Sequence, residues 1–367
     1  MNSYMNAKTN LKKLQFGLEK CHRMHVGAST SFCPDLELDD WKLRNVLDIK
    51  TGETALTDEY DGPRRPEDSD VEKYIGDLIS HDGSNLKNIM ARKAKGTGIV
   101  DNIMGKLRGT VYGPFYFEVG LVLRGYMLIN GILTNAEAWY GFSTSEMEQL
   151  EQVDENFLRI FLEVGRGCPK EMLYLETGTI PMRFIIYKRR LMFLHYILNE
   201  KDESLINKFL KTQMKNPSKN DWIDSVVNDL ELLDIPLTYD EIRGLSAAQF
   251  KSVMDKVIVK KALEHLNKVK AKHRKVMHIR HEKIEIQPYL CPQNVWNVQL
   301  SKFLFQARAR MLELRTNFKQ KHLRSGLDCE LGCMEEDSQE HLLSCDKIPV
   351  SSLFNETLPK YDDLFSS

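Results

Sequence analysis

The chain has few cysteines, almost no net charge and no uninterrupted apolar run. Seven cysteines occur among 367 residues, and residues 1–13 lack the apolar core of a signal peptide. We therefore expect a nuclear or cytoplasmic protein, not a secreted one, whose cysteines are reduced or bound to metal. The most apolar stretch, residues 111–133, contains Glu118 and Arg124. These charges favour a buried helix over a membrane span, so we expect no membrane partner.

Several sequence signatures of catalysis are also missing. The fragment Gly96-Thr-Gly98 lacks the context of a phosphate-binding loop, and no nucleophile elbow is present. Asp39 and Asp40 form the only Asp pair before the helical region, and no apolar strands flank them. A two-metal site needs carboxylates brought together on strands. These absences argue against a kinase, dehydrogenase or hydrolase, and they leave the two aspartates as an exposed turn.

The remaining patterns predict a mainly α fold with a small antiparallel β part at the N-terminus. Short strands are expected at residues 36–41, 46–49 and 73–79. Helical spacing of apolar residues begins after Ser84, and most of the expected helices open at a proline or at a Ser, Thr or Asp cap. Helices are expected over residues 114–133, 143–161, 169–177, 181–199, 204–214, 221–233, 238–245, 246–278 and 297–320.

Three cysteines and one histidine cluster within seventeen residues near the C-terminus. Cys329 and Cys333 are spaced for one tight turn, while His341 and Cys345 are four residues apart, as on one face of a short helix. Zinc prefers four tetrahedral ligands of these two types. Although four such residues can cluster by chance, we predict a structural Zn²⁺ site with these four ligands.

Basic residues are concentrated just before this cluster. Residues 251–283 contain eleven Lys or Arg and three acids, and residues 302–324 contain seven against one. A basic helix beside a zinc loop is typical of a polyanion partner, although a charge run alone more often marks a solvated face. We expect phosphate contacts from eleven side chains: Lys260, Lys261, Lys268, Lys270, Lys272, Arg274, Lys275, Arg308, Arg310, Arg315 and Lys319.

Several segments, in order along nearly the whole chain, resemble the C-terminal half of the reverse transcriptases of non-LTR (LINE-like) retrotransposons. Leu14–Met24 is similar to the segment after the catalytic hairpin, and Tyr74–Ile79 to the primer grip. The helices of residues 86–140 are similar to the thumb. Further matches are Leu173–Gly178, Pro181–Ile185 and Lys188–Arg190 to the linker, and Leu304–Met311, Asn317–Lys319 and Gln339–Leu343 to the segments around the Cys-Cys-His-Cys knuckle.

The resemblance implies RNA-directed DNA polymerase ancestry but not activity. The family's catalytic aspartates would lie upstream of Lys20, and this sequence has no Tyr-x-Asp-Asp hairpin there. Lys20 matches a lysine near the leaving pyrophosphate, yet it equally fits a surface lysine. We therefore expect no catalytic residues and no polymerisation by this chain alone, with Mg²⁺ relevant only to an intact polymerase.

Together these features predict four regions: a partial palm end at residues 1–83, a thumb-like region at 84–200, a basic linker at 201–324 and a zinc knuckle with its tail at 325–367. The resemblance implies template RNA and target DNA as partners. Three alternatives stay open. The chain is part of a working enzyme whose palm is supplied elsewhere, a helical interaction protein without a nucleic-acid role, or the product of a pseudogene.

Overall fold

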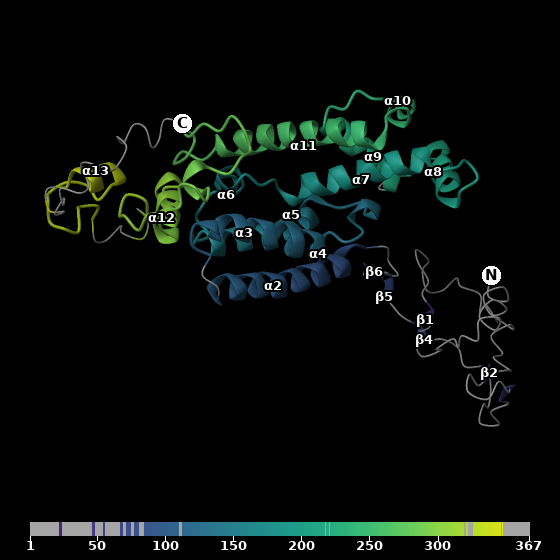
Figure 1. The fold of residues 1–367 in the computed structure, drawn as a ribbon, viewed down its shortest axis with the longest axis horizontal. Helices are drawn as coiled ribbons and strands as arrows, with labels where there is room; N and C mark the ends of the chain where they lie inside the picture. The colour runs from purple at the N-terminus through teal and green to yellow at the C-terminus, as the bar shows by residue number, and fades with distance from the viewer. Residues whose placement is uncertain are drawn as a thin grey trace. The chain divides into compact units, whose positions relative to one another are not determined.

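The protein is mainly helical, as the sequence predicts (Figure 1). The structure, a computed structural model, describes residues 84–109, 112–216, 218–219, 221–318, 321, 326–345 and 347, together with six short strands before them. The chain divides into two units, residues 1–91 and 92–367. The predicted boundaries at residues 200 and 324 do not separate further units in this division, and the four-region organisation stays a prediction.

The described strands of the first unit form two-stranded pairs. Two pairs are antiparallel, and one is parallel. The single strand expected over residues 73–79 is wrong, because two strands with Tyr74 opposite Asp77 occupy this stretch. The strand expected over residues 36–41 lies outside the described residues. The pairs are β1 (His22–Arg23) with β4 (Glu67–Asp68), β2 (Val46–Leu47) with β3 (Thr54–Ala55), and β5 (Val71–Tyr74) with β6 (Asp77–Ser80).

The helices up to α11 follow one another with short connections, whereas long segments precede η6 and α13. Figure 1 shows α11 running alongside α7, with α12 and α13 at one end and α8 and α10 at the other. Their bounds are α2 (Leu86–Gly109), η3 (Gly113–Phe115), α3 (Tyr116–Leu123), η4, a π-helix (Arg124–Ile129), α4 (Asn130–Ile132), η5 (Ala136–Ala138), α5 (Thr144–Phe161), α6 (Lys170–Thr177), α7 (Met182–Asn199), α8 (Leu205–Lys215), α9 (Trp222–Leu232), α10 (Tyr239–Gly244), α11 (Ala247–Lys270), η6 (Pro288–Leu290), α12 (Val298–Arg308) and α13 (Gln339–Ser344).

Capping side chains fix the starts of several helices where the sequence predicts them. Ser143, Thr238 and Ser246 each open a helix with a capping box, in which the hydroxyl accepts a backbone N–H three residues on. The side chain at that third position accepts the N–H of the cap residue in return. Each box therefore satisfies two amide donors that a helix start would otherwise leave unpaired.

Two helices end earlier than the sequence predicts. Helix α11 ends at Lys270 rather than His278, and the chain then turns so that Val276 and Ile279 are buried. Helix α12 ends at Arg308 rather than residue 320, because Arg310 adopts a left-handed conformation with φ of 55° that a helix cannot continue. In both cases tertiary packing overrides a local pattern that suits a longer helix.

A large apolar core surrounds α7. Leu191 and Leu194 of α7 are fully buried and share one cluster with Phe250 and Met254 of α11 and Val226 of α9. This cluster crosses residue 200, where the sequence predicted a boundary between thumb-like and linker regions. The helices on both sides of that position therefore depend on one hydrophobic core.

A buried carboxylate connects the end of α6 to two distant segments. Glu176 is completely buried; its oxygens accept hydrogen bonds from His281 Nε2 at 2.8 Å, Arg308 Nε at 3.0 Å and the Tyr289 hydroxyl. Lys270 Nζ donates to His281 Nδ1 at 2.7 Å, which leaves His281 Nε2 to donate to Glu176. Burial alone would raise the pKa of Glu176, but the hydrogen bond from His281 and the charge of Arg308 lower it overall.

Replacing Glu176 with glutamine is expected to destabilise the fold by about 3–5 kcal/mol, since Arg308 would lose its buried counter-charge. Urea unfolding followed by circular dichroism measures this change. The matched control is Glu313→Gln, which removes an exposed pair with Lys321 and should change stability by less than about 1 kcal/mol. Equal, small effects of both substitutions would contradict a structural role for the Glu176 network.

Candidate metal centre

The four predicted zinc ligands lie together in residues 327–345, which we call the metal loop. Cys329 and Cys333 lie on a tight turn closed by a hydrogen bond from Gly332 N to Cys329 O at 3.0 Å. Gly332 has φ of 78°, a left-handed conformation that glycine adopts without strain. A bridge between Asp328 and Glu336 closes the base of this turn. The turn therefore directs both thiols toward the same point.

The second ligand pair comes from helix α13 and its end. Ser338 caps the helix by accepting the N–H of His341 at 3.0 Å, and Cys345 directly follows the last helical residue. One helical turn brings residues four apart onto one face. His341 and Cys345 therefore face the two cysteines of the turn, as their spacing predicts.

The ligand atoms lie close enough together to bind one metal ion. The sulfur of Cys345 lies 3.4 Å from that of Cys333 and 4.0 Å from that of Cys329. Zinc–sulfur bonds of about 2.3 Å place tetrahedral sulfurs about 3.8 Å apart. The His341 Nε2 atom lies 2.7 Å from the Cys333 sulfur, and all four atoms fall within 4.8 Å of one another. The residues present thus fit a metal ion such as zinc.

Protein groups at this site complete the coordination of one ion. Cys329 and Cys345 are buried, and Cys333 and His341 are half-buried. Three thiolates and one imidazole fill four positions, whereas catalytic zinc sites keep one position open for water or substrate. The arrangement therefore suits a metal that stabilises the loop.

The thiols of the metal loop differ in acidity. A hydrogen bond from the Leu331 backbone N–H, together with the neighbouring Cys333, His341 and Cys345 side chains, lowers the pKa of Cys329 to about 7. Burial raises the pKa of Cys333 to about 12. Cys329 is thus the more acidic of these two thiols, and Cys333 keeps its proton at neutral pH when no metal is bound. A zinc ion must displace that proton to bind.

Two of the side chains predicted to contact phosphates, Lys270 and Arg308, are buried. Lys270 is buried and donates to Ile279 O at 2.6 Å as well as to His281, and burial lowers its pKa to about 8. Arg308 is buried against Glu176. Neither cation reaches the surface, so both have structural roles. The sequence did not show this, because the ends of α11 and α12 were predicted too late.

Five other side chains predicted to contact phosphates already bind other residues of the protein, and some of these pairs lie at its surface. Lys260 and Lys261 lie on α11 near Glu264, and Lys261 also pairs with Asp234. The other three are Lys275, which donates to Asn317 O, Arg310, which pairs with Glu340 at 2.7 Å, and Arg315, which lies 3.4 Å from Glu330. Lys319 lies outside the described residues.

The remaining predicted cations lie in residues 268–283, the end of α11 and the segment that follows it, which we call the basic loop. Lys268, Lys272 and Arg274 are exposed and make no hydrogen bond or ion pair to another described residue. Arg280 and Lys283 share both properties and were not among the predicted contacts. The sequence shows the charge run that contains them, but it predicts a helix to residue 278. Such a helix would spread its side chains around its axis, whereas the observed chain leaves the helix at Lys270.

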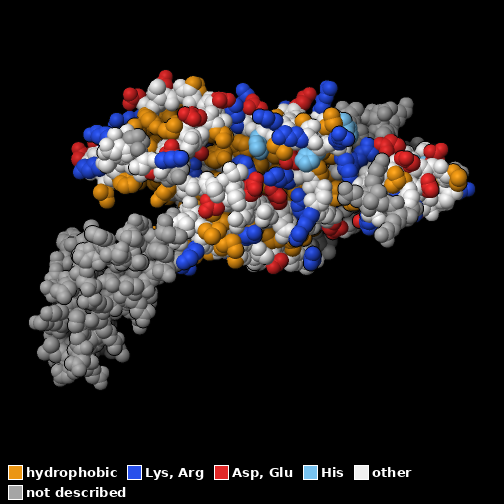
Figure 2. Space-filling view, turned by 180° about the vertical axis from the view of Figure 1, so that it is seen from behind, with side chains coloured by type: hydrophobic (Ala, Val, Ile, Leu, Met, Phe, Trp, Pro, Cys, Tyr) orange, Lys and Arg blue, Asp and Glu red, His pale blue; other side chains and the backbone are white. Residues whose placement is uncertain are grey.

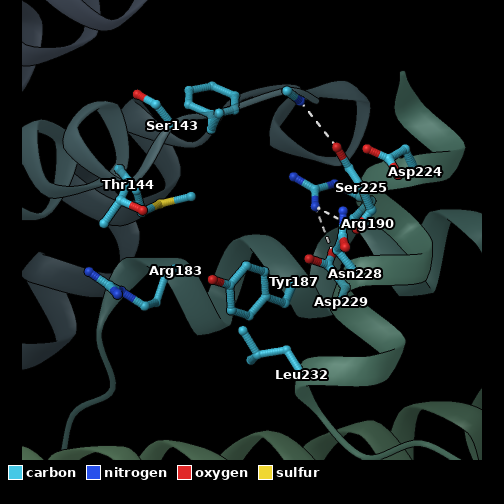
Figure 3. Close-up of a pocket in the computed structure, with 13 residues that line it drawn as sticks. Ser143, Thr144, Arg183, Tyr187, Arg190, Asp224, Ser225, Asn228, Asp229 and Leu232 are labelled. Atoms are coloured by element: carbon cyan, nitrogen blue, oxygen red, sulfur yellow. Dashed lines mark hydrogen bonds and ion pairs between the residues drawn. The ribbon is translucent and has the colours of Figure 1, made fainter. Parts of the chain in front are cut away.

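A separate hollow of about 210 Å³ lies between the start of α5, α7 and α9 (Figure 3). Both of its arginines are paired: Arg190 donates to Asp229 at 2.7 Å, and Arg183 pairs with Glu151. Burial raises the pKa of Asp229 to about 7, against the opposing charge of Arg190. The residues that line this hollow include neither a cysteine nor a histidine.

Comparisons with protein-family models, curated proteins and solved structures found no significant match to this chain in any of the three. No described helix is long and apolar enough to cross a membrane. Function must therefore be inferred from the residues and their geometry.

The purified protein is expected to contain one zinc ion per chain, detected by native mass spectrometry. Cys333→Ser removes one of four ligands and should abolish zinc retention. Cys291→Ser, which alters a half-buried thiol outside the cluster, should retain the ion and serves as the matched control. A wild-type protein that retains no zinc would refute the site.

Zinc affinity is expected to weaken as the pH falls, because protons compete with the metal for Cys333 and, below about pH 7, for Cys329. Each displaced proton makes the affinity change about tenfold per pH unit. Competition with a chromophoric chelator between about pH 8 and 6 measures this dependence. An affinity independent of pH would contradict thiol ligation.

Proposed function

We propose that this chain is a zinc-stabilised nucleic-acid-binding protein, related to the C-terminal part of non-LTR retrotransposon reverse transcriptases and without polymerase activity of its own. The ordered series of motif-like segments supports the relationship. The Cys329, Cys333, His341 and Cys345 geometry supports the zinc. Template RNA and target DNA are the partners that the resemblance implies, and Mg²⁺ would matter only beside a catalytic palm.

The observation that carries the binding proposal is the set of free cations in the basic loop. Five exposed Lys and Arg side chains within sixteen residues pair with no described acid: Lys268, Lys272, Arg274, Arg280 and Lys283. Elsewhere, cations such as Arg310 and Arg315 face carboxylates. Unpaired cations concentrated on one loop attract phosphates without first breaking an internal ion pair.

The metal loop itself carries the opposite charge. Residues 327–345 contain six Asp or Glu and no Lys or Arg. At the right of Figure 2, acidic side chains gather over the end of the protein that carries α13. Because like charges repel, phosphates should avoid this surface. We therefore assign binding to the basic loop and a structural role to the metal loop.

A second candidate function is protein binding by the metal loop. Leu331 and Met334 are 51% and 99% exposed on this acidic surface. Exposed apolar side chains with surrounding charge are typical of protein interaction sites, although a single exposed residue is also common. This candidate corresponds to a helical interaction protein without a nucleic-acid role.

Removing three free cations is expected to weaken RNA binding. The variant Lys272→Ala/Arg274→Ala/Arg280→Ala should lower affinity for a fluorescent single-stranded RNA by about tenfold or more near 100 mM salt. Its binding would form fewer phosphate contacts and would therefore release fewer counterions from the RNA. Fluorescence anisotropy measures the affinity. The control Lys201→Ala/Lys208→Ala/Lys215→Ala removes the same charge from exposed positions around α8 and should change it little.

Two outcomes would reject the proposed function. Equal losses in both triple variants would show that only net charge matters and that the basic loop has no special role. If wild type binds neither single-stranded RNA nor duplex DNA, the nucleic-acid role fails, and protein binding by the metal loop becomes the better account.

A further inference from the structure

We propose that zinc controls nucleic-acid binding indirectly: the metal loop positions the basic loop through a continuous set of hydrogen bonds, without touching the nucleic acid. The binding part of this inference rests on the proposed function. The positional part stands on contacts within residues 268–345 and can be tested separately.

The first step joins the metal loop to the segment after α12. Asp337 and Gln339 lie between the ligands Cys333 and His341, and both are buried. The Asp337 carboxylate accepts the N–H of Arg315 at 2.8 Å, and its carbonyl oxygen accepts the Thr316 hydroxyl at 2.7 Å. An acidic residue inside the metal loop is thus used for internal contacts.

Gln339 adds two hydrogen bonds to this connection, one from its amide nitrogen and one to its amide oxygen. Its Nε2 donates to Ala307 O at 3.0 Å, at the end of α12. Its Oε1 accepts from Asn317 Nδ2 at 3.3 Å, and the same Asn317 nitrogen donates to Leu312 O at 3.0 Å. These groups are buried, so each would be costly to leave unpaired if the metal loop moved away.

The second step joins that segment to the basic loop. Lys275 Nζ donates to the carbonyl oxygen of Asn317 and lies 5.5 Å from the Phe318 ring centroid. Lys275 stands between the free cations Arg274 and Arg280 in the sequence, and Val276 beside it is buried. A fixed Lys275 therefore restricts where the neighbouring cations point.

These contacts give zinc an effect on a surface that it does not touch. The metal loop has few apolar residues, so its conformation depends on the metal. Without zinc, Asp337 and Gln339 lose their fixed positions, and Thr316 and Asn317 lose their partners. The basic loop then becomes more mobile, and ordering it on binding costs affinity. Loss of zinc also frees Arg310 from Glu340 and Arg315 from Glu330. The freed cations would raise the affinity for RNA, but they would not change amide hydrogen exchange in the basic loop.

Hydrogen–deuterium exchange of the full chain, with zinc and after chelation, tests the positional part. We expect amides of residues 271–281 and 312–318 to exchange about tenfold faster or more without zinc, while those of α7 stay protected. Unchanged exchange at 271–281 would overturn the inference. Loss of protection throughout α7 would also overturn it, because zinc would then support the whole fold and not this connection.

A variant that keeps the zinc ligands separates the connection from the metal. Thr316→Val/Asn317→Ala removes the side-chain hydrogen bonds to Asp337 and Gln339. We expect it to retain one zinc per chain, yet to show fast exchange at 271–281 and several-fold weaker binding to single-stranded RNA. The matched control Thr212→Val/Asn228→Ala, on α8 and α9, should behave as wild type.

The results distinguish the two proposals. If zinc-loaded wild type binds no RNA, the proposed function fails, while the exchange data still decide the positional part. If it binds RNA and the Thr316→Val/Asn317→Ala variant binds as tightly and exchanges as slowly as wild type, only the zinc connection is wrong. RNA affinity that stays equal or rises after chelation would likewise contradict indirect control by zinc.

Discussion

The buried carboxylate of Glu176 determines how the second half of the chain is arranged. It lies at the end of α6 and receives hydrogen bonds from His281, Tyr289 and Arg308, which come from a loop, a short helix and the end of α12. Burial opposes its ionisation, but these donors lower its pKa overall, so it stays a carboxylate at neutral pH. A buried charge that lost them would be strongly destabilising.

This constraint explains the course of the chain after α11. The chain leaves the helix at Lys270, whose ammonium group contacts both Ile279 O and His281, and the following turn brings His281 to Glu176. The intervening residues turn at the surface and expose Lys272, Arg274 and Arg280. Arg308 is placed by the same carboxylate, and the metal loop docks just beyond it. Charge is thereby divided between a basic loop and an acidic metal loop.

Local signals in the sequence predicted much of this structure. The caps at Ser143, Thr238 and Ser246 depend on residues three apart, and the four metal ligands lie within seventeen residues. Neither feature needs knowledge of the rest of the fold. The zinc ligands could thus be named from spacing alone, although the identity of the metal stays a prediction.

Distant interactions could not be predicted in this way. Glu176 is 105 residues from His281 and 132 from Arg308. No periodicity or spacing connects them, so Lys270 and Arg308 were interpreted as surface cations. The helix ends at Lys270 and Arg308 were missed for the same reason. Internal contacts of this kind leave only a few of the predicted phosphate-binding side chains exposed and unpaired. Arg280 and Lys283, which are also exposed and unpaired among the described residues, join this set.

We propose that nucleic acid binds at the basic loop and not at the metal loop. Ultraviolet cross-linking of the zinc-loaded full chain to a single-stranded RNA, followed by mass spectrometry of the peptides, tests it most directly. Binding at the basic loop would give cross-links within residues 268–283. Binding at the basic loop is refuted if the cross-links concentrate within residues 327–345. It is also refuted if cross-linking is no stronger than that of a control protein that does not bind RNA.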